Sequence, residues 1–340
     1  MQKTLKIALA TAFAVAGTAS AAVAGDSLDA IKKRGELVCG VSTGLGGFSV
    51  PDSSGKFTGL DVDVCKAVAA ASLGDAEKVK FVPLTAQQRF TALQSGEVDI
   101  LSRNTTWTLT RDTSLGLNFA GVSYYDGQGF MVPKKLGVKS AKELDGATVC
   151  VQPGTTTELN LADYFRANNM SFKPVVIEKL ADVNAAFFSG RCDVYTTDAS
   201  GLASVRKNDA PKGESDNYVI LPEIISKEPL GPVVRHGDDQ LFDIVKWTLN
   251  ALIEAEEYGI TAANVGEMAG STNPGIQRLL GVTPGMGKNL GVDEEWAKRA
   301  IAAVGNYGEI WTRNIEPLGL PRGVNNLWTN GGIMYAPPVR

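Results

Sequence analysis

Two distant segments of the chain repeat one pattern, and this repeat limits the fold more than any other feature. FTALQSGEVDIL (90–101) and NAAFFSGRCDVY (184–195) each join a helical stretch, a Ser-Gly stop and a strand that opens on Asp99 or Asp193. Around both segments the predicted strands and helices alternate, which indicates a mostly parallel sheet covered by helices. The simplest account is two similar α/β lobes built from βαβ units.

The order of the segments predicts how the lobes are connected. The chain has 340 residues, a natural size for two domains. We predict that residues 25–130 and 231–340 form lobe 1, with a C-terminal extension, and that residues 131–230 form lobe 2. A chain that leaves one lobe, builds another and returns crosses between them twice. These two crossovers are the predicted hinge.

The first 24 residues have the features of a secretory signal peptide. Lys3 and Lys6 precede an apolar run that ends in Ala22-Val23-Ala24, a typical small-residue cleavage site. We predict cleavage after Ala24, with Ala21 as the alternative site. Alanine, threonine and glycine dilute the run, which favours a signal peptide over a membrane anchor. The formal net charge of -4 argues against nucleic acid or an anionic membrane as a partner.

The four cysteines suggest two disulfides, because their number is even and the chain is predicted to be exported. They are Cys39, Cys65, Cys150 and Cys192. Four cysteines allow three pairings, and the sequence does not choose among them. We favour Cys39–Cys65 and Cys150–Cys192, one bond within each half. No Cys-x-x-Cys pair or nearby histidine is present, so we expect no metal site.

Catalytic residue types are scarce. The single histidine, His236, stands in the charged segment VVRHGDD. GVSTG (40–44), with Ser42 at its centre, matches the Gly-x-Ser-x-Gly pattern of a nucleophile elbow. An elbow requires a helix directly after the serine, and here the loop LGGFSVPDSSGKFTG follows. We therefore interpret the match as chance, and a serine hydrolase is the least favoured hypothesis.

Three features at predicted strand ends suit an α-amino acid instead. The run SRNTTWTLTRDTS (102–114) is rich in hydroxyl and amide side chains, and near its end stands Arg111. The planar guanidinium group of an arginine matches a carboxylate. QPGTTTE places Thr155 and Thr156 at a helix N-terminus, which favours an anion. Asp198 ends another strand, where it can pair with an ammonium group. Taken singly, the arginine also fits a surface salt bridge, and the threonines and Asp198 also fit helix caps.

The chain resembles the periplasmic solute-binding proteins of ABC importers, in the polar amino-acid branch known as family 3. The likeness is carried by GFSVPDSSGKFTGLDVDVCKAV, GEVDIL, TTWTLTRDTSLGLNFAGVSYYDGQGFMV, VQPGTTTE and GRCDVYTTD. The tail GNYGEIWTRNIEPLGLPRGVNNLWTNGGIMYAPPVR is similar to that of the general L-amino-acid-binding members. The resemblance implies a type II Venus-flytrap fold that closes on one free L-amino acid. It also implies a periplasmic monomer without a cofactor that delivers this ligand to a permease with its ATPase subunits.

The resemblance further implies how the α-carboxylate is bound. Arg111 matches the family's carboxylate-binding arginine, and Thr106 matches its hydroxyl partner. Thr156 matches the second-lobe threonine whose backbone contacts the same carboxylate, and Thr155 helps to shape that turn.

The other implied positions concern the ammonium group and the ligand side chain. Asp198 matches the ammonium-binding acid, and Asn104 falls where a backbone carbonyl accepts an ammonium proton. Arg89 fits one of the two arginines that read the side chain in glutamate and aspartate binders, while Ser42 occupies the other position. Ser42 and Leu45 stand where binders of basic amino acids have an acid and an aromatic residue. These departures predict broad specificity.

An enzyme on the same scaffold is the alternative hypothesis. The exported cyclohexadienyl dehydratases, which act on arogenate or prephenate, resemble this family in fold. Such an enzyme needs a general acid in the cleft, for which Glu158 and Asp198 are the candidates.

Overall fold

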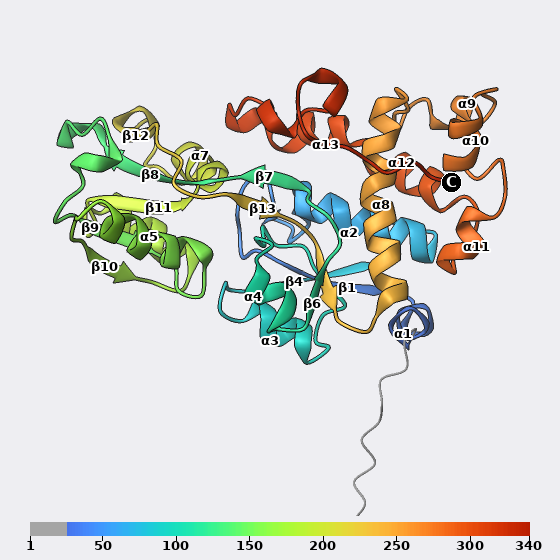
Figure 1. Ribbon diagram of the computed structural model, residues 1–340, viewed down its shortest axis with the longest axis horizontal. Helices are drawn as coiled ribbons and strands as arrows, with labels where there is room; N and C mark the ends of the chain where they lie inside the picture. The colour runs from blue at the N-terminus through green and yellow to red at the C-terminus, as the bar shows by residue number, and fades with distance from the viewer. Residues whose placement is uncertain (1–25) are drawn as a thin grey trace, which may run out of the picture.

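The computed structural model describes residues 26–340, which fold into two lobes lying side by side (Figure 1). Residues 1–25, with the predicted signal peptide and its cleavage site at Ala24, lie outside the described residues. Each lobe contains a five-stranded sheet with helices packed on it, so the predicted two-lobe α/β fold is confirmed. No helix between residues 26 and 340 is long and apolar enough to cross a membrane.

The first sheet combines strands from distant parts of the chain. Its order is β4 (Val79–Pro83), β1 (Leu37–Val41), β5 (Ile100–Leu101), β14 (Val233–Arg235) and β6 (Leu117–Phe119). β1 runs parallel to β4 and β5, whereas β14 runs antiparallel to β5 and β6. The chain therefore returns to this sheet after building the other lobe, as the predicted crossovers require.

The second sheet repeats this arrangement. Its order is β10 (Lys173–Val176), β9 (Thr148–Val151), β11 (Val194–Asp198), β8 (Gln128–Pro133) and β12 (Tyr218–Ile220). β9 runs parallel to β10 and β11, and β8 runs antiparallel to β11 and β12. The residue limits of the two lobes stay a prediction.

The two aspartates of the sequence repeat hold equivalent places in the two sheets. Asp99 Oδ2 accepts a hydrogen bond from the backbone N–H of Val38 in β1 at 2.8 Å. Asp193 Oδ2 accepts one from the backbone N–H of Thr148 in β9 at 2.9 Å. Each aspartate ties the amino end of its own central strand to the neighbouring strand. The sequence repeat therefore reflects the same contact between neighbouring strands in both sheets.

Helices and short strands complete the lobes. The first lobe has α1 (Asp26–Arg34), α2 (Leu60–Leu73), α3 (Arg89–Gln94), α4 (Leu109–Thr113), α8 (Asp239–Glu257) and the hairpin of β2 (Val50–Pro51) and β3 (Phe57–Thr58). The second lobe has α5 (Thr156–Ala167), α6 (Leu180–Phe188), α7 (Ala199–Asn208) and the 3-10 turns η1 (Lys134–Leu136), η2 (Ala141–Glu143) and η3 (Ser215–Asn217).

Two short strands connect the lobes. β7 (Tyr124–Asp126) pairs antiparallel with β13 (Glu228–Leu230), and both run between the lobes in Figure 1. The chain beyond α8 forms the C-terminal extension. It contains α9 (Val265–Met268), α10 (Pro274–Leu279), α11 (Met286–Leu290), α12 (Trp296–Val304), α13 (Tyr307–Asn314), η4 (Glu316–Leu318), η5 (Gly323–Asn325) and η6 (Trp328–Asn330).

The C-terminal extension packs on the first lobe through one apolar cluster. Val64 and Ala67 of α2, Leu252 of α8, and Ile301 and Val304 of α12 belong to it, and all five are buried. Burial of apolar side chains stabilises such a contact by about 25 cal/mol per Å². The extension is therefore part of the first lobe's core.

Each lobe contains one disulfide. Cys39 of β1 is bonded to Cys65 of α2, with 6.4 Å between their Cα atoms. Cys150 of β9 is bonded to Cys192, just before β11, with 5.6 Å between their Cα atoms. This is the pairing that we favoured from the sequence.

Candidate ligand-binding site

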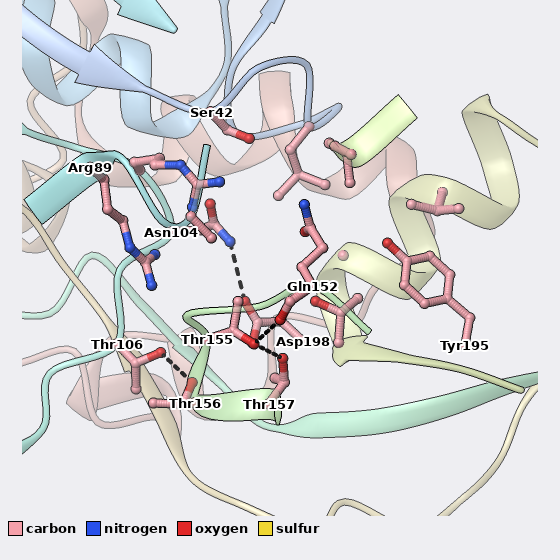
Figure 2. A pocket seen from close by; sticks show the side chains of 17 residues that line it. Ser42, Arg89, Asn104, Thr106, Gln152, Thr155, Thr156, Thr157, Tyr195 and Asp198 are labelled. Atoms are coloured by element: carbon pink, nitrogen blue, oxygen red, sulfur yellow. Dashed lines mark hydrogen bonds between the residues drawn. The ribbon is translucent and has the colours of Figure 1, made fainter. Parts of the chain in front are cut away.

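A cavity lies between the lobes at the carboxyl ends of their central strands (Figure 2). The empty volume at this cavity, counted together with space open to solvent, is about 540 Å³. In α/β sheets, ligands bind at this end of the strands. The first lobe contributes Ser42, Leu45, Ala86, Arg89, Arg103, Asn104 and Thr106, and the second contributes Gln152, Thr155, Thr156, Thr157, Leu180, Tyr195, Thr197, Asp198, Gly201 and Val205. Of the predicted site residues, all except Arg111 line this cavity.

Asp198 ends β11 and lines the cavity from the second lobe. It stands at the N-cap position of α7, yet its side chain caps no backbone N–H. The helix cap, its alternative role, is therefore not realised. Burial raises the pKa of Asp198 well above its usual range, and the nearby carboxylates Asp126 and Glu228 raise it further. A ligand cation beside Asp198 would offset this cost of its charged form.

Asn104 contacts Asp198 from the first lobe. Its Nδ2 donates a hydrogen bond to Asp198 Oδ2 at 3.3 Å across the cleft (Figure 2). Its φ of 34° lies in the left-handed region, which asparagine tolerates better than most residues. The backbone N–H of Asn104 donates to Asp61 Oδ2 at 2.8 Å, and this holds the turn. Asp61 is buried in the first turn of α2, and burial raises its pKa to about 6.

Thr106 and Thr156 meet across the cleft, with 3.3 Å between their Oγ1 atoms. Both hydroxyls donate to Oε2 of Glu228, at 2.6 and 2.8 Å respectively. Glu228 is 1% exposed and belongs to the connecting strand β13. The hydroxyl that we predicted to meet a ligand carboxylate thus donates here to a carboxylate of the protein. Glu228 links both lobes to the hinge.

Thr155 fixes the second-lobe turn. Its side chain accepts a hydrogen bond from the backbone N–H of Glu158 at 3.0 Å, which caps α5. Glu158 Oε2 in turn accepts the N–H of Gly154 at 2.9 Å. The capping role that the sequence left open for Thr155 is therefore realised. Glu158 does not line the cavity, and its carboxylate is engaged in this turn.

Arg111 lies in the short helix α4, behind Thr106. Its Nη1 donates to the carbonyl oxygen of Thr106 at 2.8 Å, and its guanidinium lies over the Phe90 ring at 5.0 Å. It is 7% exposed and forms no salt bridge with any described residue. A surface salt bridge is therefore not its role. Its contact with a ligand carboxylate stays a prediction.

Two other arginines line the cavity. Arg89, in the first turn of α3, reaches the carbonyl oxygen of Gly154 in the other lobe, with 3.4 Å from its Nη2, and its buried Nε has no partner among the described residues. Arg103, two residues after β5, donates from Nε to the carbonyl oxygen of Leu84 at 2.9 Å. Burial lowers the pKa of Arg103 to about 10, so this guanidinium remains charged at neutral pH.

Ser42 lines the cavity but has no catalytic setting. The chain after it forms turns and the isolated bridge Leu45–Ser49, so the helix of a nucleophile elbow is missing, as the sequence indicates. His236 is exposed and does not line the cavity. Across residues 26–340, no His, Cys, Asp and Glu side chains are grouped to hold a metal ion.

Sequence reasoning missed several residues of this site. Arg103 and Tyr195 line the cavity, and the buried hydroxyl of Tyr195 has no partner within the described part of the chain. Asp61 and Glu228 act from behind the cavity wall. Tyr195 and Thr197 alternate along β11, so a strand pattern could have put them on one face. Arg103, Asp61 and Glu228 carry no comparable local signal.

A comparison with known families identifies the chain. Residues 37–263 match the bacterial extracellular solute-binding proteins, family 3. The protein belongs to this family. The family resemblance that the sequence motifs indicated is thereby confirmed, and the residues beyond 263, most of the C-terminal extension, lie outside the match.

Individual proteins in this comparison are similar over nearly their whole length. The general L-amino acid-binding periplasmic protein AapJ of Rhizobium johnstonii is 60% identical over 335 residues, 96% of each chain. The glutamate/glutamine/aspartate/asparagine-binding protein BztA of Rhodobacter capsulatus is 61% identical over 336 residues, 98% of this chain and 97% of that protein. A solved periplasmic binding protein of an ABC transporter from Brucella ovis, with glutathione bound, is 58% identical with a TM-score of 0.90. That match covers 92% of this chain and 99% of the other.

Proposed function

We propose that the protein binds L-α-amino acids of several side-chain classes in the periplasm and delivers them to an ABC-type importer. One observation carries the proposal. The cavity between the lobes holds Asp198, which neither caps a helix nor forms a salt bridge with the described residues, together with buried arginines that also lack an acidic partner. An unpaired carboxylate and unpaired guanidinium groups in one cavity match the ammonium and carboxylate groups of a zwitterion. The names of the similar proteins support the same ligand class.

The mechanism is closure of the two lobes about the hinge. Asp198 pairs with the ligand's ammonium group, and Arg111 binds its α-carboxylate, as the family resemblance implies. Asp198 and Arg111 belong to different lobes, so a ligand with both charges stabilises the closed form. Cross-lobe hydrogen bonds add to closure, among them Thr85 Oγ1 donating to Glu178 Oε1 at 2.8 Å.

The apolar wall of the cavity supports a broad range of side chains. Leu45, Leu180 and Val205 line the cavity together with its charged groups. An apolar wall accepts neutral side chains without leaving polar groups of the site unpaired, so discrimination among them is weak.

The route to the periplasm rests on the N-terminal segment. We propose cleavage after Ala24 and export of a monomer that meets the permease and ATPase subunits of an importer. The two disulfides suit an oxidising compartment.

Replacing Arg111 by alanine tests the carboxylate assignment. We expect amino-acid affinity to fall about 100-fold, near 3 kcal/mol, because the carboxylate loses its bidentate partner in a buried site. Isothermal calorimetry with L-glutamine and L-leucine measures this loss. Arg166→Ala, an exposed arginine on α5, is the matched control. Unchanged affinity in Arg111→Ala contradicts the role of Arg111, and no binding of any amino acid by the unaltered protein contradicts the proposed function.

The dehydratase alternative retains one supporting observation. The raised pKa of Asp198, caused chiefly by burial, would keep a general acid protonated in the cleft. Glu158, the other candidate, is held in the turn at Gly154. Incubation with arogenate or prephenate separates the two hypotheses, and we expect no turnover.

A further inference from the structure

Three buried arginines lie in the cavity wall or directly behind it. Arg89, Arg103 and Arg111 are 3%, 4% and 7% exposed, and none forms a salt bridge with a residue between 26 and 340. Each makes one side-chain hydrogen bond within that range, to a backbone carbonyl. A guanidinium group carries five N–H donors, so most of these donors are free to meet a ligand.

One α-carboxylate does not satisfy this cluster. Burial lowers the pKa of Arg89, and Arg111 and Arg103 lower it further, whereas the carboxylates of Asp198 and Glu228 partly offset this effect. A single carboxylate matches one guanidinium fork, and on the proposed function this fork is Arg111. Arg89 and Arg103 then still line the cavity without a salt bridge to a described residue, although the charge of Asp61 acts on Arg103 from behind the wall.

We infer that Arg103 is a specificity-determining residue that binds a second carboxylate of the ligand, an inference that rests on the proposed function. Arg103 stands at the carboxyl end of β5, and its Nε is held by the carbonyl oxygen of Leu84. This bond orients the side chain and leaves Nη1 and Nη2 for a bidentate contact. The ligand class is an α-amino acid with a second carboxylate, either a dicarboxylic amino acid or a γ-glutamyl peptide.

Calorimetry on the whole exported protein tests this with L-glutamate, L-glutamine, L-leucine and glutathione. L-Glutamate and L-glutamine have the same shape, so their affinity ratio isolates the second carboxylate. We expect the unaltered protein to favour glutamate over glutamine by about 10-fold, as a charge-assisted bond allows. In Arg103→Gln this ratio should fall to about 2, because the charge-assisted bond to the second carboxylate is lost, and leucine measured in the same variant gives the loss common to all ligands.

Two further variants make the result specific. Arg191→Gln, an exposed arginine, should leave the ratio unchanged. Arg103→Lys keeps the charge but lacks the planar fork, so it should restore only part of the glutamate preference. If Arg103→Gln loses tight binding of glutathione, the ligand class is a γ-glutamyl peptide. If the variant loses affinity for L-glutamate alone, the ligand class is the free dicarboxylic amino acid. Equal affinities for glutamate and glutamine in the unaltered protein overturn the inference while leaving amino-acid binding intact.

The C-terminal extension contacts the hinge strand β7 through Asn325. Asn325 in η5 is 3% exposed, and its side-chain amide bonds both the N–H and the carbonyl oxygen of Tyr125. Its Oδ1 accepts the Tyr125 N–H at 2.7 Å, and its Nδ2 donates to the Tyr125 carbonyl oxygen at 3.0 Å. These bonds hold the Tyr125 backbone as a neighbouring strand would.

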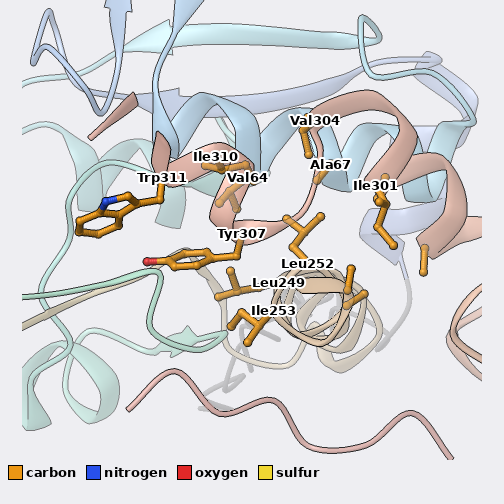
Figure 3. Packing of buried hydrophobic residues seen from close by; sticks show 14 of the residues in the cluster. Val64, Ala67, Leu249, Leu252, Ile253, Ile301, Val304, Tyr307, Ile310 and Trp311 are labelled. Atoms are coloured by element: carbon orange, nitrogen blue, oxygen red, sulfur yellow. The ribbon is translucent and has the colours of Figure 1, made fainter. Parts of the chain in front are cut away.

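Two aromatic residues of α13 hold the adjacent hinge residues. The hydroxyl of Tyr307 donates to the carbonyl oxygen of Ser123 at 2.8 Å. The Trp311 ring stacks on Tyr124, with 5.5 Å between ring centroids and 4° between planes. Figure 3 shows Tyr307 and Trp311 with their rings directed to the same side of the buried cluster to which both belong. Three consecutive hinge residues are therefore each held by the extension.

The extension also contacts the second lobe. The Lys207 ammonium of α7 donates to the carbonyl oxygen of Pro317 in η4. We propose that the extension is a brace that holds β7 in the closed form and raises the affinity for all ligands alike. Hinge bending changes the backbone angles of such a strand and would break the bonds of Asn325. By stabilising the closed form, the extension increases the fraction of molecules that can hold ligand.

Asn325→Ala tests the brace. Small-angle X-ray scattering should show a larger radius of gyration without ligand and an unchanged one with saturating L-glutamate. Affinity should fall about 5-fold for glutamate and leucine equally, because the closed form is less populated. Asn330→Ala, exposed in η6, is the control of the same residue type. A lower melting temperature with unchanged affinity and unchanged scattering would overturn the brace and leave Asn325 a purely structural residue.

Discussion

Replacing Asp198 by asparagine will weaken the binding of every amino acid by about 100-fold or more, near 3 kcal/mol, because an ammonium group loses its buried counterion. The substitution keeps the shape of the side chain, so the cavity is not enlarged. Isothermal calorimetry with a neutral and an acidic amino acid measures the effect. Asp216→Asn, an exposed aspartate of the same lobe, should bind as the unaltered protein does.

The same residue predicts how binding depends on pH. Burial, then Asp126 and Glu228, raise the pKa of Asp198 in the ligand-free protein, and a bound ammonium group lowers it. Binding therefore releases a proton, and affinity increases with pH until Asp198 is ionised in the free protein. Calorimetry in two buffers with different ionisation enthalpies counts the released protons. An Asp198→Asn variant that retains full affinity and the same proton release would contradict the role of Asp198.

The second large effect concerns stability. Removing the Cys150–Cys192 disulfide in the double variant Cys150→Ser, Cys192→Ser should lower the free energy of unfolding by about 4 kcal/mol, because the bond closes a separation of 42 residues in the unfolded chain. Denaturant unfolding with and without a reducing agent measures this. The double variant should lose part of the sensitivity to reduction, and the remainder should come from Cys39–Cys65. An unchanged unfolding curve would contradict a stabilising role for this bond.

Local patterns predicted the parts of the protein that depend on neighbouring residues. The repeat around Asp99 and Asp193 predicted two similar lobes, because these aspartates close equivalent strand pairs. Strand ends followed by polar residues predicted Asp198, Asn104 and Thr156 at the cavity, because the carboxyl ends of parallel strands share one edge.

The missed residues behind the cavity wall, Asp61 and Glu228, depend on contacts far along the chain. Asp61 and Asn104 are joined across 43 residues, and Thr106 and Glu228 across 122. No periodicity records such a contact. Arg89 was predicted and lines the cavity, but Arg103 was missed, because the turn after β5 places Arg103 in the wall and α4 places Arg111 behind Thr106.

By itself, the sequence determined the two-lobe fold and the family and led to the proposed zwitterion site, because periodicity, turn residues and residue type are local properties. Only the tertiary structure decided which side chains face one another. It paired the four cysteines, directed the hydroxyls of Thr106 and Thr156 to Glu228, and set the C-terminal extension against the hinge strand β7. The physical reason is that burial and charge act between residues that are close in space. Their separation along the chain does not show which residues these are.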